Sequence, residues 1–208
     1  MDNAAVKNQL LPVLSKYVPT GTAELLVEWI VEHKVVLKIT PPRKSILGNY
    51  YHPNKRRGHV ITVNGNLNAY AFFVTLVHEL AHMEAWLKHQ NKVAPHGGEW
   101  KAEFRTLMHR FLRNGVLPDH IERSLESYLH NPAAASCSDE GLTRTLKRYD
   151  KTQALTVEQL PHEALFQHNN RTFKKGPQLR KRFRCVEVAT RRVYLFSPVA
   201  EVSPVEQG

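Results

Sequence analysis

The chain has 208 residues, 42% of them hydrophobic, which suffices for one globular domain or for a domain with a small appendage. Its 29 Lys and Arg against 19 Asp and Glu give a formal net charge of +10, so we expect an acidic partner, nucleic acid first and an anionic surface second, with simple solubility as the alternative. Two cysteines, Cys137 and Cys185, are too few for a disulfide framework, and we expect a reduced, cytoplasmic setting. No apolar run is long enough to cross a bilayer, so no membrane contact is expected.

Two helical patterns open the chain. The pattern of residues 3–18 predicts a short helix that is interrupted near Pro12, or a new helix that begins there. Residues 20–34 form an amphipathic pattern, with Thr20 or Thr22 as its N-cap.

The pattern then changes to short β-strands. β-Branched and aromatic residues alternate with polar ones, and the dipeptide Asn64-Gly65 is typical of a turn. The predicted strands cover about residues 34–40, 44–51 and 58–64.

A long apolar helix follows this strand region. Asn66 or Asn68 can cap it, and it should run to about Lys88. After a loop, a second helix is expected from Glu99 to Asn114, closed by Gly115.

The C-terminal part has strand patterns again, from about residue 155 to residue 202. We therefore predict an α+β fold: a core of residues 1–130, with helices packed on a short three-stranded sheet, and a linker and small β-rich region at 131–208.

The long helix contains the sequence VTLVHELAHMEAW, from Val74 to Trp86. His78 and His82 are four residues apart and so share one helix face, which suits two nitrogen ligands of a tetrahedral Zn²⁺ ion. Glu79 is rotated by about 100° from His78, where it can take a proton from a metal-bound water. The alternative is a pair of solvated histidines, which the apolar flanking residues argue against.

The third ligand should lie after this helix, because catalytic zinc usually has three protein ligands and one open position. The metzincin spacing requires histidine where the chain has Lys88, and His89 is too far along the helix axis. His96 lies in the Gly-rich loop PHGGEW, where the chain can fold back. We predict that His78, His82 and His96 bind one Zn²⁺ ion, with an ordinary loop histidine as the alternative for His96.

The motifs VHELAHMEAW and HGGEWKAEF together resemble the SprT-like family of zinc metalloprotease domains, which includes Spartan-type DNA–protein crosslink proteases. The resemblance covers about residues 20–115, including the predicted hairpin RKSILGNYY…HVITVN. It implies a small zincin-like core around the HExxH helix, with His78, His82 and His96 as ligands and Glu79 as catalytic acid/base. It also implies protein substrates on or near DNA.

The C-terminal region departs from that family. Many members carry a zinc ribbon with four cysteines, whereas this chain has two in total, so a second zinc site is not expected. We expect a ribbon-like sheet that is stabilised by apolar packing, with Cys185 as a core thiol.

Basic residues gather in this region between Arg171 and Arg192. On strands they can track phosphates, and Phe173 and Phe183 can stack on unpaired bases. The alternative is a solvated basic face with both phenylalanines inside. The residues predicted to bind nucleic acid are Lys174, Lys175, Arg180, Lys181, Arg182 and Arg184.

Three functions stay open at this point. The first is a zinc-dependent peptidase that acts on proteins on or near DNA, with Glu79 as general acid/base. The second is a nucleic-acid-binding or transcription-associated protein in which zinc is mainly structural, and the third is a zinc hydrolase of a non-peptide substrate. Tyr50 and Tyr51 are candidates for stabilising an oxyanion, and Glu84 and Glu99 for orienting the imidazoles; strand packing and solvated helix charges are the alternatives.

Overall fold

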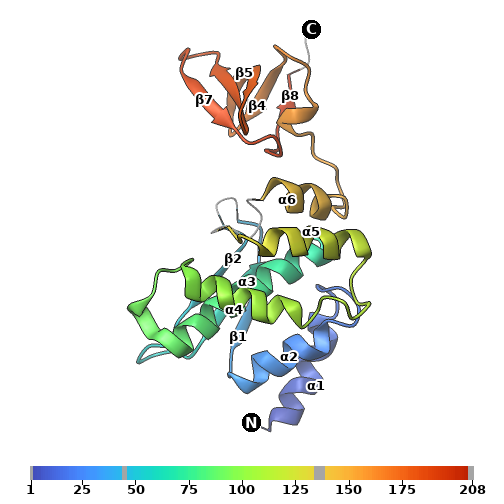
Figure 1. The fold of residues 1–208 in the computed structure, drawn as a ribbon, viewed down its shortest axis with the longest axis vertical. Helices are drawn as coiled ribbons and strands as arrows, with labels where there is room; N and C mark the ends of the chain where they lie inside the picture. The colour runs from blue at the N-terminus through green and yellow to red at the C-terminus, as the bar shows by residue number, and fades with distance from the viewer. Residues whose placement is uncertain (1, 44–45, 134–138, 206–208) are drawn as a thin grey trace. The chain divides into compact units, whose positions relative to one another are not determined.

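The computed structural model describes residues 2–43, 46–133 and 139–205 (Figure 1). Their fold is mixed α+β, with six α-helices and two sheets, as the sequence predicted. The chain divides into two compact units, Met1–Asp150 and Lys151–Gly208. No helix in the described ranges combines the length and the apolarity that crossing a lipid bilayer requires.

The first unit begins with α1 (Asn3–Leu14) and α2 (Ala23–Glu32). Asp2 caps α1 through its side chain, and Pro12 lies inside this helix without interrupting it. Thr22 occupies the N-cap position of α2, but its hydroxyl donates to the carbonyl of Pro19 instead of capping the helix.

A three-stranded sheet follows, formed by β1 (Val36–Thr40), β2 (Gly48–Tyr51) and β3 (Val60–Asn64). The order is β1-β3-β2, with β1 parallel and β2 antiparallel to β3. All five residues of β3 are buried, as expected for a central strand. The three predicted strands are confirmed, and β2 is an edge strand of this sheet.

The predicted long helix is α3 (Ala69–His89), which packs against β2 and β3. The Asn68 side chain accepts from the backbone N–H of Ala71 and so caps it. Every residue from Ala71 to Ala81 is buried, which explains the continuous apolar pattern. A 3₁₀ turn (η1, Gln90–Lys92) then leads to α4 (Gly98–His109), and α4 packs against α3.

Two further helices, α5 (Asp119–Leu129) and α6 (Glu140–Lys147), complete the first unit. Leu142 and Leu146 of α6 belong to the same core as α3 and α4. The Asn68 amide also donates to the Leu146 carbonyl and to the Asp150 carboxylate. The first unit therefore continues to Asp150, beyond the boundary expected at residue 130, because α6 buries its apolar face in the first core.

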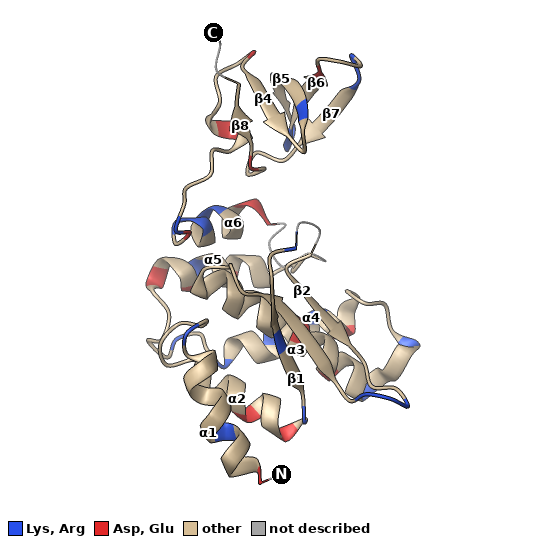
Figure 2. Ribbon diagram, turned by 180° about the vertical axis from the view of Figure 1, so that it is seen from behind, with Lys and Arg blue, Asp and Glu red and all other residues tan. Residues whose placement is uncertain are grey.

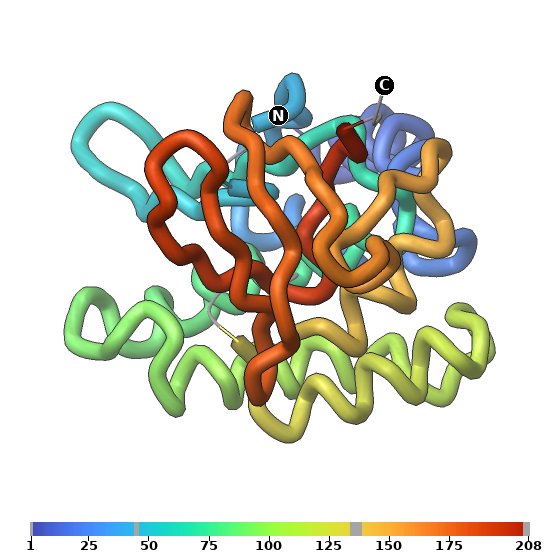
Figure 3. Tube along the Cα trace, turned by 90° about the horizontal axis from the view of Figure 1, so that it is seen from above, coloured from blue at the N-terminus to red at the C-terminus, as the bar shows by residue number. Residues whose placement is uncertain are grey.

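The second unit is β-rich, as predicted, and Figure 3 traces its successive antiparallel strands in orange and red. A 3₁₀ turn, η2 (Val157–Gln159), precedes the sheet, whose strand order is β7-β6-β5-β4-β8. The strands are β4 (Leu165–His168), β5 (Arg171–Leu179), β6 (Arg182–Glu187), β7 (Val193–Phe196) and β8 (Ser203–Pro204).

This unit has a small apolar core of its own, which includes Phe166, Phe173, Phe183 and Cys185. Cys185 is a buried free thiol, as expected. Cys137 lies outside the described residues.

Candidate metal centre

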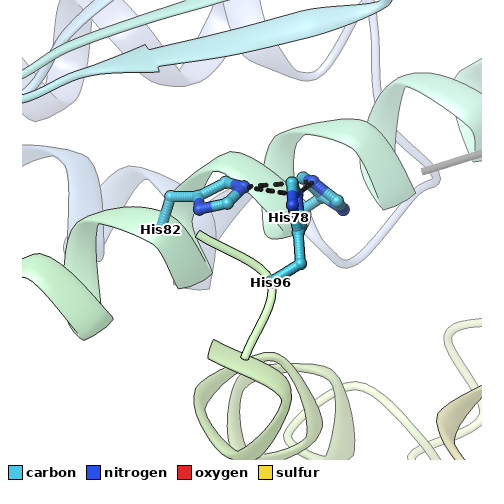
Figure 4. Close-up of side chains that lie close together, drawn as sticks. All are labelled: His78, His82 and His96. Carbon is cyan, nitrogen blue, oxygen red and sulfur yellow. Dashed lines mark hydrogen bonds between the residues drawn. The ribbon is translucent and has the colours of Figure 1, made fainter. Parts of the chain in front are cut away.

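Three imidazoles converge on one point beside α3 (Figure 4). His78 and His82 come from successive turns of α3, and His96 comes from the loop before α4. The Nε2 atoms of His78 and His82 are 3.3 Å apart, those of His82 and His96 are 3.0 Å apart, and those of His78 and His96 are 3.3 Å apart. The structure thus brings the three predicted ligands together in the first unit, close enough to bind a metal ion.

This triangle of nitrogen atoms matches the geometry of a tetrahedral ion. With metal–nitrogen bonds of about 2.0–2.1 Å and tetrahedral angles, as for Zn²⁺, neighbouring ligand atoms lie about 3.3 Å apart. Three neutral nitrogen donors suit Zn²⁺ but also other transition metals, so the donor set by itself does not fix the ion. The residues fit a metal that has three protein ligands and one further coordination position.

The chain between α3 and α4 places His96. The Gly97 backbone N–H donates to the Ala94 carbonyl at 3.0 Å and so closes a tight turn around His96. A Cβ atom at Gly97 would lie 3.3 Å from the Ala94 carbonyl oxygen, so this turn leaves little room for a side chain. The packing of α4 against α3 then holds this turn beside His78 and His82.

Trp100, the first fully buried residue of α4, forms the floor of the site. Its ring centroid lies 4.5 Å from that of His78, 5.3 Å from that of His82 and 4.9 Å from that of His96. The indole Nε1 donates to the His78 carbonyl, and Phe104 stacks on the outer face of the indole. The sequence does not reveal this contact; its single signal is the place of Trp100 four residues after His96.

Burial also sets the charge state of the ligands. Loss of hydration, followed by the neighbouring imidazoles, lowers the pKa of His78 and that of His82 to about 3. Burial also lowers the pKa of His96. All three rings are therefore neutral near pH 7, the form in which a ring nitrogen has a lone pair for a metal. His78 Nδ1 is buried and has no hydrogen-bond partner among the described residues, so its ring is oriented by packing against Trp100.

Glu79 is buried between α3 and the edge strand β2. Burial raises the pKa of its carboxyl group to about 8, while the backbone N–H of Tyr50 and the charge of Arg43 lower it in part. A carboxyl group with a pKa near neutrality can both accept and return a proton, which is what general acid/base chemistry requires. The structure therefore places a buried carboxyl group with a raised pKa one residue after His78.

The missing side chain of Gly48 makes room for Glu79. A Cβ atom on Gly48 would lie 2.7 Å from Cγ2 of Thr75, and 2.9 Å from both Cγ and Oε1 of Glu79. β2 can approach α3 this closely only because it has glycine at this position. The sequence does not reveal this contact, because it depends on how β2 packs against α3.

The segment before β2 is held by Arg43 and Asn64. Arg43 donates to the Asn64 side-chain oxygen at 2.7 Å and to the Thr62 hydroxyl at 3.0 Å. The Asn64 amide donates back to the carbonyl groups of Arg43 and Ile46. This network fixes the approach of β2 to Glu79.

Comparisons with protein-family models, with curated proteins and with solved structures found no match to this chain. The resemblance to SprT-like proteases therefore stays an interpretation of two motifs, and the geometry around His78, His82 and His96 carries the functional argument.

The residues predicted to stabilise an oxyanion or to orient the imidazoles contact other groups. The Tyr50 hydroxyl lies 2.9 Å from Nδ1 of His59, and Glu84 pairs with His33 at 3.6 Å. Glu99 is exposed in the first turn of α4. No contact links the Tyr50 hydroxyl or Glu84 to the three imidazoles in the part of the chain that the structure describes, so their predicted roles have no support here.

The predicted nucleic-acid residues lie on β5, β6 and the turn between them. Lys175 is a correction: its side chain is buried, and its ammonium donates to the carbonyls of Glu158 and Leu160, so it does not face a phosphate. Lys174 is exposed and pairs with Glu163 at 2.8 Å. The other four predicted residues, Arg180, Lys181, Arg182 and Arg184, are exposed.

The two phenylalanines of this region are buried. Phe173 and Phe183 belong to the core of the second unit, so the interpretation that they stack on bases is wrong, and the alternative that both lie inside is confirmed. Strand alternation explains the difference, because residues that interleave with exposed arginines on a strand point to the opposite face.

Proposed function

We propose that this protein is a zinc-dependent peptidase with its active centre at His78, His82 and His96. The observation that supports this most directly is the convergence of three Nε2 atoms within 3.3 Å of one another, beside a buried carboxyl group on the same helix. A structural zinc site normally has four protein ligands, whereas three ligands and a neighbouring acid are typical of a catalytic site. When bound, Zn²⁺ would polarise a carbonyl oxygen and lower the pKa of a water molecule.

Within this proposal, the residues of the chain have separate tasks. The imidazoles hold the ion, and Trp100 holds the imidazoles by packing against all three rings. Glu79 takes a proton from the attacking water and then delivers it to the leaving amine. The Tyr50 N–H and the open space at Gly48 keep the carboxyl group in place for both steps.

The surrounding fold is consistent with a small zincin-like core, in which the HExxH helix packs against a short sheet. The substrate class is inferred from the sequence alone: the net charge of +10 and the motif resemblance favour proteins on or near DNA. A nucleic-acid-binding protein with structural zinc is the second candidate, and the exposed cluster Arg180–Arg182 is the observation that favours it.

The test is Glu79→Gln, measured for zinc content and for cleavage of an unfolded, fluorescently labelled protein. We expect zinc content to stay at one ion per chain and cleavage to fall by about 10²–10⁴-fold, the usual contribution of general acid/base catalysis. Glu84→Gln is the matched control, because Glu84 lies on the same helix but pairs with His33. Equal cleavage by Glu79→Gln and the unchanged protein would reject the peptidase.

A further inference from the structure

The edge strand β7 of the second unit exposes two aliphatic side chains to solvent. Val193 and Leu195 are 47% and 53% exposed, among the most exposed large apolar side chains of the described chain. β7 pairs with β6 on one side only, since it ends the strand order β7-β6-β5-β4-β8. Exposed aliphatic side chains on an unpaired edge are a liability unless a partner covers them.

The register shows which backbone groups of β7 are unpaired. The Arg192 carbonyl accepts from the N–H of Glu187 on β6, so the backbone carbonyl of Arg192 points towards β6. Because consecutive residues of a strand alternate in direction, Tyr194 and Phe196 also face β6, while Val193 and Leu195 direct their N–H and C=O groups away from it. These outward groups have no backbone hydrogen bond to any other described segment. The edge therefore offers two donors and two acceptors at the spacing of an extended chain.

Cations flank the apolar side chains on the same face of the sheet. Arg184 lies opposite Leu195, and Arg182 lies opposite Leu179, which is 46% exposed. Directly opposed residues share a face, so these arginines and aliphatic side chains form one surface. Neither Arg182 nor Arg184 has a carboxylate partner among the residues that the structure describes. Figure 2 shows the basic segments on the β5–β7 strands in blue.

Charge complementarity selects the occupant of this surface. Residues 151–208 contain ten Lys and Arg against five Glu, a net charge of +5. A second copy would bring two such surfaces together, and their like charges would repel. A nucleic acid would neutralise the arginines but would leave Val193 and Leu195 uncovered, and the aromatic residues Phe173 and Phe183 are buried.

We propose that β7 and the adjoining face of β6 bind an extended segment of a partner protein in which every second residue is aliphatic or acidic, so that both kinds of side chain point to the same face of the added strand. The segment adds a strand beside β7, with main-chain hydrogen bonds to Val193 and Leu195. Its aliphatic side chains cover these two residues, and its carboxylates pair with Arg182 and Arg184.

The full chain with the substitution Glu79→Gln serves as the binding protein, so that no probe is cleaved and the result does not depend on the proposed peptidase. Fluorescence anisotropy compares three labelled probes: an eight-residue Asp–Val peptide (Val-Ser-Asp-Ser-Val-Ser-Asp-Ser), which has Val and Asp on one face of a strand; the Lys–Val peptide, with Lys in place of Asp; and single-stranded oligo-dT. We expect saturable binding of the Asp–Val peptide, and affinity at least about tenfold lower for the Lys–Val peptide.

Leu195→Pro tests the edge directly. It removes the outward N–H of Leu195 without removing a hydrogen bond to β6, so we expect affinity for the Asp–Val peptide to fall by about tenfold. Leu195→Val is the matched control, because it keeps both the N–H and an aliphatic side chain; it should bind as the unsubstituted chain does.

A charge reversal provides a second, independent variant. Arg184→Glu should lower the affinity for the Asp–Val peptide by about tenfold, whereas Arg123→Glu, an exposed arginine of α5, should leave it unchanged. Unaltered binding by both Leu195→Pro and Arg184→Glu would overturn the proposal. So would binding of oligo-dT but not of the peptide, or a dimer in sedimentation that Leu195→Pro dissociates.

Discussion

Replacing Gly48 by alanine would place one methyl group between β2 and α3. The new Cβ would lie 2.7 Å from Thr75 Cγ2 and 2.9 Å from Glu79 Cγ, whereas ordinary carbon contacts are about 3.5–4.0 Å. The overlap is about 0.6–1.3 Å, so strand and helix must separate or the Glu79 side chain must move. Overpacking of this kind costs about 1–3 kcal/mol in the free energy of unfolding. If Glu79 is displaced by about 1 Å, cleavage should fall by up to about 10²-fold.

The assay combines urea unfolding, zinc content and cleavage of the labelled protein substrate. Zinc content should not change, because Gly48 contacts Glu79 and not the three imidazoles. Gly58→Ala is the matched control: a Cβ there meets nothing within 4 Å, so stability and cleavage should stay within error. If Gly48→Ala behaves like Gly58→Ala in all three measurements, β2 does not approach Glu79 as described.

Three other predictions concern the ligands, the floor of the site and the second unit. His96→Ala should remove zinc binding and the increase in melting temperature that zinc gives, whereas His109→Ala, exposed at the end of α4, should keep both. Trp100→Ala should cost about 3–5 kcal/mol in urea unfolding because it empties a fully buried site, and equal stability would contradict the packing described. Arg171 and Thr190 donate hydrogen bonds to the Glu187 carboxylate and lower its pKa to about 2. The ionised carboxylate therefore stabilises the folded protein above about pH 4.5, and this stabilisation is lost as the pH falls towards 2. Glu187→Gln should therefore lower the melting temperature at pH 7 but not at pH 2, and an equal decrease at both values would argue against this pair.

Local patterns were sufficient to predict much of the first unit. The β-branched and aromatic residues of β1, β2 and β3 and the long apolar sequence of α3 predicted their positions within a few residues, because buried segments select apolar residues and their length separates strands from helices. The four-residue spacing of His78 and His82 predicted their common direction, because residues four apart share one face of a helix.

Contacts between distant segments were not predictable in this way. The approach of Gly48 to Glu79 depends on how β2 sits on α3, and the contact of Trp100 with three imidazoles depends on how α4 packs. Lys175 follows Phe173 by two residues and shares its buried face, but its burial depends on the carbonyl groups of Glu158 and Leu160, which accept from its ammonium group and which the strand pattern does not reveal. The place of α6 in the first unit follows from Leu142 and Leu146, which join the core that also contains residues of α3 and α4, and from the hydrogen bond of the Asn68 amide to the Leu146 carbonyl.

X-ray absorption at the zinc edge on the zinc-loaded protein tests the central claim most directly. The account predicts three imidazole nitrogens at about 2.0–2.1 Å and one oxygen at a similar distance, with one imidazole lost in His96→Ala. A spectrum with fewer than three imidazoles, or one that His96→Ala leaves unchanged, would contradict a metal centre formed by His78, His82 and His96.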